Sequence, residues 1–137
     1  MKSIEAVNEF VIRFANVNGT GSASANAMFG KSIFRMGIPV SPKNIFPNIQ
    51  GLPTWYEVRV SEKNYLGRRG GVDIAVAINP QSMAQDMSDL NPGGFFIYDN
   101  TKALDLRLHR DDVNLIGLPL TDICRREYSQ ARQRQLF

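Results

Sequence analysis

Apolar residues along the chain recur in two kinds of pattern, which together predict alternating strands and helices. Runs rich in β-branched and aromatic residues are typical of strands, whereas apolar residues spaced three and four positions apart indicate a helix. The patterns predict strands over residues 10–17, 38–41, 56–60, 72–78, 94–99 and 113–120, and helices over residues 22–36, 80–90 and 121–137.

Glycine and proline mark the ends of several of these elements. Gly37 supplies a stop for the first helix, and the sequence Asn91-Pro92-Gly93-Gly94 predicts the end of the second. Pro39 and Pro42 confine the strand over residues 38–41 to an edge of the sheet, because proline cannot donate a backbone hydrogen bond there. Four methionines fall at helical spacing and are expected in the core: Met28, Met36, Met83 and Met87.

The order of these elements predicts the fold class. Residues 72–78 form a nearly continuous apolar run, which indicates a central strand buried on both faces. Strands separated by helices and short turns favour an α/β layered domain with a mainly parallel sheet.

Composition narrows the class of protein. The chain has 137 residues, of which 43% are hydrophobic and 21% charged, as expected for one compact domain. The net charge is only +3, and the basic residues do not form the cluster that is typical of nucleic-acid-binding proteins. No stretch approaches the roughly 20 apolar residues of a membrane span, and the N-terminus lacks the apolar region of a signal peptide. We therefore expect no nucleic-acid or membrane partner and a cytoplasmic location.

The turn between the first strand and the first helix is the sharpest candidate for a binding site. It consists of Asn18, Gly19, Thr20, Gly21 and Ser22. Two glycines permit a tight turn, and free backbone N–H groups at a helix start attract an anion such as phosphate. An acidic residue about 20 positions further on, which the dinucleotide fingerprint requires, is missing, so NAD binding is disfavoured. A purely structural turn, with Ser22 capping the helix, is an equally open interpretation.

Two further segments have both a possible binding role and a structural interpretation. The stiff loop over residues 46–55, which carries Trp55, suits recognition or packing between subunits. Arg68 and Arg69, among glycines, are interpreted as either a clamp for an anionic group or a solvated turn. His109 lies in a charged loop and is expected at the surface, and Cys124 is expected in the core.

Several catalytic motifs are absent from the sequence. It contains no CxxC, HExxH, GxxxxGK[ST] or GxSxG. An iron–sulfur cluster, a zinc protease, a P-loop and a hydrolase nucleophile elbow therefore all lack ligands or nucleophiles in this chain. The residues themselves indicate a binding or scaffold domain, and a freestanding nucleotide-binding module is one alternative.

Several segments in order resemble a known family. The segments are FVIRFANVNGTGSASAN, then FGKSIFRMGIPVSPKNIFPNIQGLPTWYEVRVSEK, YLGRRGGVDIAVAINPQSMAQDM and NPGGFFIYDNTK. The sequence over residues 7–120 closely resembles the N-terminal gamma domain of the alpha subunit of 2-oxoacid:ferredoxin oxidoreductases, particularly the 2-oxoglutarate type.

The resemblance implies a fold and a role. The fold is a three-layer α/β sandwich with a mainly parallel or mixed sheet, like domain III of pyruvate:ferredoxin oxidoreductase. The parent enzyme would decarboxylate a 2-oxoacid with thiamine diphosphate, pass electrons through iron–sulfur clusters to ferredoxin, and transfer the acyl group to coenzyme A.

The resemblance also implies which parts of that enzyme bind the cofactors and which serve in packing. Residues 1–137 would form one gamma-type domain, truncated at its C-terminal end, that packs on the other alpha-subunit domains and the beta subunit. Thiamine diphosphate and the clusters would lie in those partners, and this chain would hold no catalytic residue. A coenzyme A phosphate is then the implied anion for Asn18, Gly19, Thr20, Gly21 and Ser22.

Overall fold

The computed structural model describes residues 4–16, 22–46 and 52–128. Its strands are β1 (Glu9–Asn16), β2 (Val40–Ile45), β3 (Thr54–Ser61), β4 (Val72–Ala77), β5 (Leu90–Asp99) and β6 (Asn114–Leu118). Its helices are α1 (Ser22–Arg35), α2 (Met83–Asp89), the short 3-10 turn η1 (Leu106–Leu108) and α3 (Leu120–Glu127).

The strands form one six-stranded mixed sheet in the order β2-β3-β1-β4-β5-β6. The neighbours β1–β4, β4–β5 and β5–β6 are parallel, whereas β3 runs antiparallel to both β1 and β2. In the parallel half, β4, α2 and β5 form a βαβ unit, and β2 and β3 supply the antiparallel half. The predicted α/β class is confirmed, with a mixed sheet.

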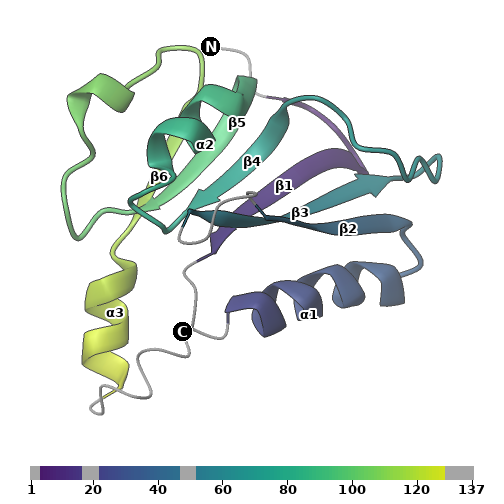
Figure 1. The fold of residues 1–137 in the computed structure, drawn as a ribbon, viewed down its shortest axis with the longest axis horizontal. Helices are drawn as coiled ribbons and strands as arrows, with labels where there is room; N and C mark the ends of the chain where they lie inside the picture. The colour runs from purple at the N-terminus through teal and green to yellow at the C-terminus, as the bar shows by residue number, and fades with distance from the viewer. Residues whose placement is uncertain (1–3, 17–21, 47–51, 129–137) are drawn as a thin grey trace.

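Helices cover the two faces of this sheet, giving three layers (Figure 1). On one face, Ile33 of α1 packs with Ile12, Tyr56 and Val58. On the opposite face, Met87 of α2 packs in a second core with residues of β4 and β5: Val72, Ala75, Ala77, Leu90 and Phe96. β4 contributes to both cores, because the strand pleat sends Ala75 and Ala77 to the second core and Ile74 and Val76 to the first.

Several predicted boundaries and positions are wrong in detail. β5 begins at Leu90 and not at the predicted residue 94, so Asn91–Gly94 belong to the strand, although α2 ends at Asp89, directly before it, as predicted. β2 begins at Val40 and reaches Ile45, although its position at the sheet edge is confirmed. Met28 on α1 and Met36 directly after it are exposed and are not core residues, whereas Met87 is buried.

The two edge strands differ in chemistry. β2 exposes Pro42 and Lys43. Pro42 cannot donate a backbone hydrogen bond to an added strand, and the charge of Lys43 opposes such pairing. β6 has the sequence NLIGL, with no charged residue, and exposes Ile116 and Leu118. Only the β2 edge therefore carries the usual protection against strand addition.

Candidate functional site

The predicted phosphate-binding turn follows β1, which lies where the strand order of the sheet reverses. Residues 18–21 lie outside the described residues, but the ends of the turn are described: Asn16 closes β1 and Ser22 opens α1. From β1 the chain passes through α1 toward the β2 edge, whereas β4 passes through α2 to β5 on the other side. Open α/β sheets bind ligands at such a switch point, beyond the carboxyl ends of the parallel strands.

Three asparagines join the elements around this switch point. Asn26 Nδ2 donates to Asn16 Oδ1 at 2.6 Å, and Asn79 Nδ2 donates to the backbone oxygen of Asn16 at 2.9 Å. All three residues are buried. They connect the end of β1, the first turns of α1 and the β4–α2 connection, so both ends of the predicted turn are anchored.

The asparagine cluster also shapes the β4–α2 connection. Asn79 Oδ1 accepts from the backbone N–H of Gln81 at 3.0 Å, and the Asn79 carbonyl accepts from the backbone N–H of Ser82 at 3.1 Å. These are the local bonds by which Asn favours turns. Sequence reasoning missed this cluster, although an Asn at the carboxyl end of each of two apolar strands was visible.

Arg68 and Arg69 are engaged by carboxylates of the same chain. Arg68 Nε lies 3.2 Å from Glu57 Oε1, and Arg69 forms an ion pair with Asp73. Glu57 is also bonded to the buried Arg13, which pairs in turn with Asp89, so the three arginines are balanced by three carboxylates. Because both arginines are paired with carboxylates of this chain, the contacts support neither a clamp for an anionic group nor a purely solvated turn.

Trp55 occupies a different place from the one expected. It lies within β3, and its Nε1 donates to Asp86 Oδ1 at 2.7 Å. Ser82 Oγ donates to the other oxygen of Asp86 at 2.7 Å. Burial raises the pKa of Asp86, while these hydrogen bonds oppose the shift. Trp55 thus fastens β3 to α2, whereas Phe46 and Leu52 of the same predicted loop are exposed.

The remaining candidates are quickly placed. His109 is exposed, as predicted, and Cys124 is partly buried. Within residues 4–16, 22–46 and 52–128, no group of three His, Cys, Asp or Glu residues is arranged to hold a metal ion. Across the same part of the chain, no helix is long and apolar enough to span a membrane.

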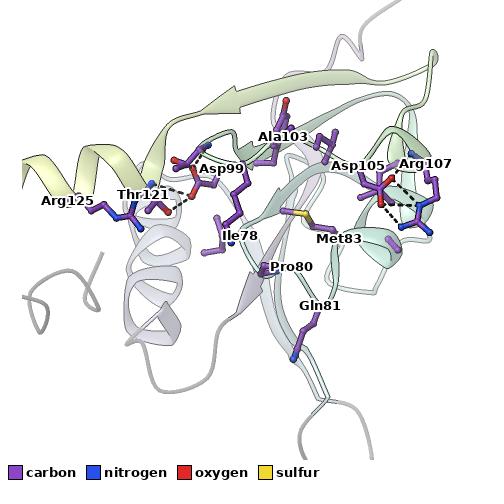
Figure 2. A pocket seen from close by; sticks show the side chains of 16 residues that line it. Ile78, Pro80, Gln81, Met83, Asp99, Ala103, Asp105, Arg107, Thr121 and Arg125 are labelled. Carbon is purple, nitrogen blue, oxygen red and sulfur yellow. Dashed lines mark hydrogen bonds and ion pairs between the residues drawn. The ribbon is translucent and has the colours of Figure 1, made fainter.

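A cavity of about 950 Å³ lies next to the switch point, at the carboxyl ends of β4, β5 and β6. Ile78, Pro80 and Gln81 form its near wall (Figure 2). These residues flank or directly follow Asn79, so one short connection serves both the asparagine cluster and the cavity.

The fold defines a three-layer α/β domain with a mixed sheet, and the sequence defines its family. The profile of the pyruvate ferredoxin/flavodoxin oxidoreductase family matches residues 11–135. The chain therefore belongs to this family. No match was found among curated proteins.

Solved structures share the fold. A 2-oxoglutarate:ferredoxin oxidoreductase from Magnetococcus marinus, with 2-oxoglutarate, coenzyme A and succinyl-CoA bound, matches with a TM-score of 0.79 and 21% identity. The gamma subunit of a keto/oxoacid ferredoxin oxidoreductase from Geobacter sulfurreducens PCA matches with a TM-score of 0.71 and 16% identity. A pyruvate oxidoreductase subunit from Thermotoga maritima matches with a TM-score of 0.67 and 18% identity.

These matches differ in how much of each relative they cover. The Magnetococcus match covers 95% of this chain but 23% of that one. The Geobacter match covers 92% of this chain and 70% of the relative, and the Thermotoga match covers 95% and 74%. The chain thus spans about a quarter of the first relative and about three quarters of the other two.

Proposed function

We propose that this chain is a gamma-type domain of a 2-oxoacid:ferredoxin oxidoreductase of the 2-oxoglutarate type. The reaction of the whole complex converts a 2-oxoacid and coenzyme A to the acyl-CoA and CO₂, with two electrons passed to ferredoxin. The family match over residues 11–135 carries this proposal. The shared fold with a gamma subunit supports it, and so does the Magnetococcus relative named for 2-oxoglutarate.

Within that complex we assign this domain to packing and ligand binding. The chain has one cysteine, whereas a cluster requires a full set of ligands, commonly four cysteines. We therefore assign the iron–sulfur clusters and thiamine diphosphate to other alpha-subunit domains and the beta subunit. We place the complex in the cytoplasm.

The turn formed by Asn18, Gly19, Thr20, Gly21 and Ser22 is the proposed contact for a phosphate of coenzyme A. Backbone N–H groups at the start of α1, together with the positive end of its dipole, are suited to an anion. The switch-point position and the anchoring of Asn16 by Asn26 and Asn79 support this assignment. The side chains of Asn26 and Asn79 both donate to Asn16, so their role is to fix the turn.

Co-purification tests membership of the complex. The full chain carrying an affinity tag is expressed in its native cells and isolated with its partners. We expect thiamine diphosphate and iron–sulfur absorbance in the isolated complex, together with ferredoxin reduction that depends on a 2-oxoacid and coenzyme A. A complex without thiamine diphosphate and clusters, or turnover by the purified chain alone, contradicts the proposal.

A pair of glycine substitutions tests the turn separately. Gly21→Asp adds a negative charge and a side chain in the turn, and should weaken coenzyme A affinity of the assembled enzyme by about tenfold or more. Gly67→Asp is the matched control, because Gly67 follows β3 near the opposite end of the strands and its Cβ position has no neighbour within 4 Å. Equal affinity in both variants contradicts the phosphate role and favours a pure scaffold.

Ligand titration separates the freestanding nucleotide-binding alternative. The purified chain and the complex are titrated with coenzyme A, ADP and NAD. Binding of NAD with no response to coenzyme A would favour that alternative over the proposed role.

A further inference from the structure

The edge strand β6 directs part of its backbone away from the sheet. The backbone oxygen of Leu118 accepts from the N–H of Asn100 at 3.0 Å, so Leu118 faces β5. In a parallel ladder, the N–H and C=O of one residue point to the same side of the strand, and those of the next residue point to the opposite side. Ile116 therefore also faces β5, whereas Leu115 and Gly117 direct both backbone groups outward.

These outward groups are open to a further strand. In the described part of the chain, β6 ends the sheet, and no hydrogen bond outside its ladder with β5 reaches the backbone of Leu115 or Gly117. Pro119 follows directly after β6 and has no N–H to donate. The edge therefore offers two N–H and two C=O groups from two residues, and it carries no charge that would oppose pairing.

The side chains at this edge are apolar and partly exposed. Leu115 packs against the core around Phe96 on the α2 side of the sheet, so Ile116 and Leu118 face the opposite side. On that side α1 contacts β1, β2 and β3, at the other half of the sheet (Figure 1). Ile116 and Leu118 remain 37% and 40% exposed. A strand added at β6 would cover part of this apolar surface.

A second copy of β6 matches the edge in hydrogen bonding, side chains and charge. When two copies lie antiparallel about a twofold axis through Ile116, Leu115 of each copy lies opposite Gly117 of the other. Residues paired in this way exchange both N–H···O bonds, so all the outward groups of both copies are used. The two Ile116 side chains meet at the axis as an apolar pair. Because β6 has no charged residue, the two copies bring no like charges together.

We propose that β6 is a self-association edge, through which two copies of this chain join their sheets antiparallel about Ile116. The interface is isologous, since the same residues of both copies form it. Because β6 has only five residues, the dimer is reversible and not permanent. The inference goes beyond the proposed function, because it concerns contact between two copies and does not depend on the parent complex.

Sedimentation equilibrium of the purified full chain measures this association. We expect the fraction of dimer to rise with concentration. Ile116→Lys places like charges directly opposite each other and should raise the dissociation constant by at least about tenfold, as should Ile116→Glu. An equimolar mixture of these two variants places opposite charges at the axis and should restore the dimer. Phe46→Lys, at an exposed apolar residue after β2, is the control and should leave the constant unchanged.

Cysteine cross-linking tests the register of the two strands. Cys124→Ser removes the one cysteine of the chain and provides the background. Adding Ile116→Cys places two thiols at the axis, where the Cα atoms of a non-hydrogen-bonded pair lie about 4.5 Å apart, within reach of a disulfide. Leu118→Cys is the matched control, because it is similarly exposed but would lie about 14 Å along the strand from its own copy. Mild oxidation should yield a covalent dimer from Ile116→Cys and not from Leu118→Cys.

Three results would overturn the inference: a monomer at every concentration, an unchanged dissociation constant for Ile116→Lys, or equal cross-linking of the two cysteine variants. Circular dichroism verifies that each variant keeps its fold, and the cross-linking decides the matter if Ile116→Lys does not fold. A monomeric chain whose Ile116→Lys variant no longer retains its partner subunits would assign the edge to a strand of another protein, which also overturns self-association. Failure of the natural chain to co-purify with partners contradicts the proposed function and leaves these measurements unaffected.

Discussion

The ion pair between Arg13 and Glu57 offers a sharp test of the packing between β1 and β3. Both residues are almost fully buried, with 5% and 4% of their surface exposed. Arg13 Nη2 and Nε lie 3.1 and 3.3 Å from Glu57 Oε2, and Arg13 Nη1 lies 2.5 Å from Asp89. Substituting Glu57 leaves two guanidinium donors of Arg13 without an acceptor in a dry environment.

Removing one partner should be far more damaging than removing both. Glu57→Leu should lower the free energy of unfolding by about 3–5 kcal/mol, since it leaves a buried charge poorly compensated. In the double variant Arg13→Met with Glu57→Leu, half-exposed Arg68 and one-third-exposed Asp89 can be hydrated. The double variant should therefore lie within about 1 kcal/mol of the natural chain.

Urea unfolding followed by circular dichroism measures these free energies by linear extrapolation. Arg107→Met, which breaks the exposed pair with Asp105, is the control and should produce no measurable change. Glu57→Gln, which retains an acceptor oxygen, provides a milder variant if Glu57→Leu does not fold. Loss in the double variant equal to the sum of the single losses would refute the coupling.

Three other perturbations follow from the structure. Gly94→Ala should destabilise the fold by about 1–3 kcal/mol because its Cβ would lie 2.8 Å from two backbone oxygens, whereas Gly70→Ala meets nothing within 4 Å; thermal unfolding compares them. Burial raises the pKa of Asp86 above 3.8, so its stabilising effect relative to Asp86→Asn should fall as pH rises above about 4, and a growing effect would contradict this. Although burial opposes it, hydrogen bonds from Thr121 and Thr101 lower the pKa of Asp99, so its advantage over Asp99→Asn should be lost as pH falls below about 4 in the same melts.

The long periodic segments could be predicted closely from the sequence. Residues 10–17 and 72–78 were predicted as strands, and the structure has β1 at Glu9–Asn16 and β4 at Val72–Ala77. The first helix was predicted over 22–36 and ends at Arg35. These segments bury continuous apolar surface, so their local pattern and the tertiary packing favour the same structure.

The segment at Asn91 was predicted only in part. Asn-Pro-Gly-Gly correctly predicts the end of α2, but the same residues also belong to β5, where the register with β4 shifts between Val72 and Ile74. Asn91 Nδ2 donates to Asp73 Oδ1 at 2.8 Å, and the backbone at Gly94 lies close enough to that of Asp73 to exclude a side chain. The neighbouring strand determines this conformation, and the sequence does not display that neighbour.

The candidate site was predictable as a segment but not as an assembly. Glycines drew attention to the turn, which remains a prediction because residues 18–21 lie outside the described residues. Asn26 and Asn79 stand 10 and 63 positions from Asn16, so their contacts depend on the strand order. Likewise, the hydrogen bond between Arg68 and Glu57 could not be predicted from the sequence, because the hydrogen bonds and burial of Glu57 arise only after β1 and β3 pair.

The difference between the two sheet edges sets a limit on self-association. Of the two edges of the sheet formed by the described residues, only β6 lacks a proline or a charge, so strand addition would use it. Two copies joined in this way would each present the β2 edge outward, where Pro42 and Lys43 oppose another strand. Association through strand edges would then stop at a dimer. A sheet with one protected edge therefore opposes fibre formation, while its β6 edge can still pair with one other strand.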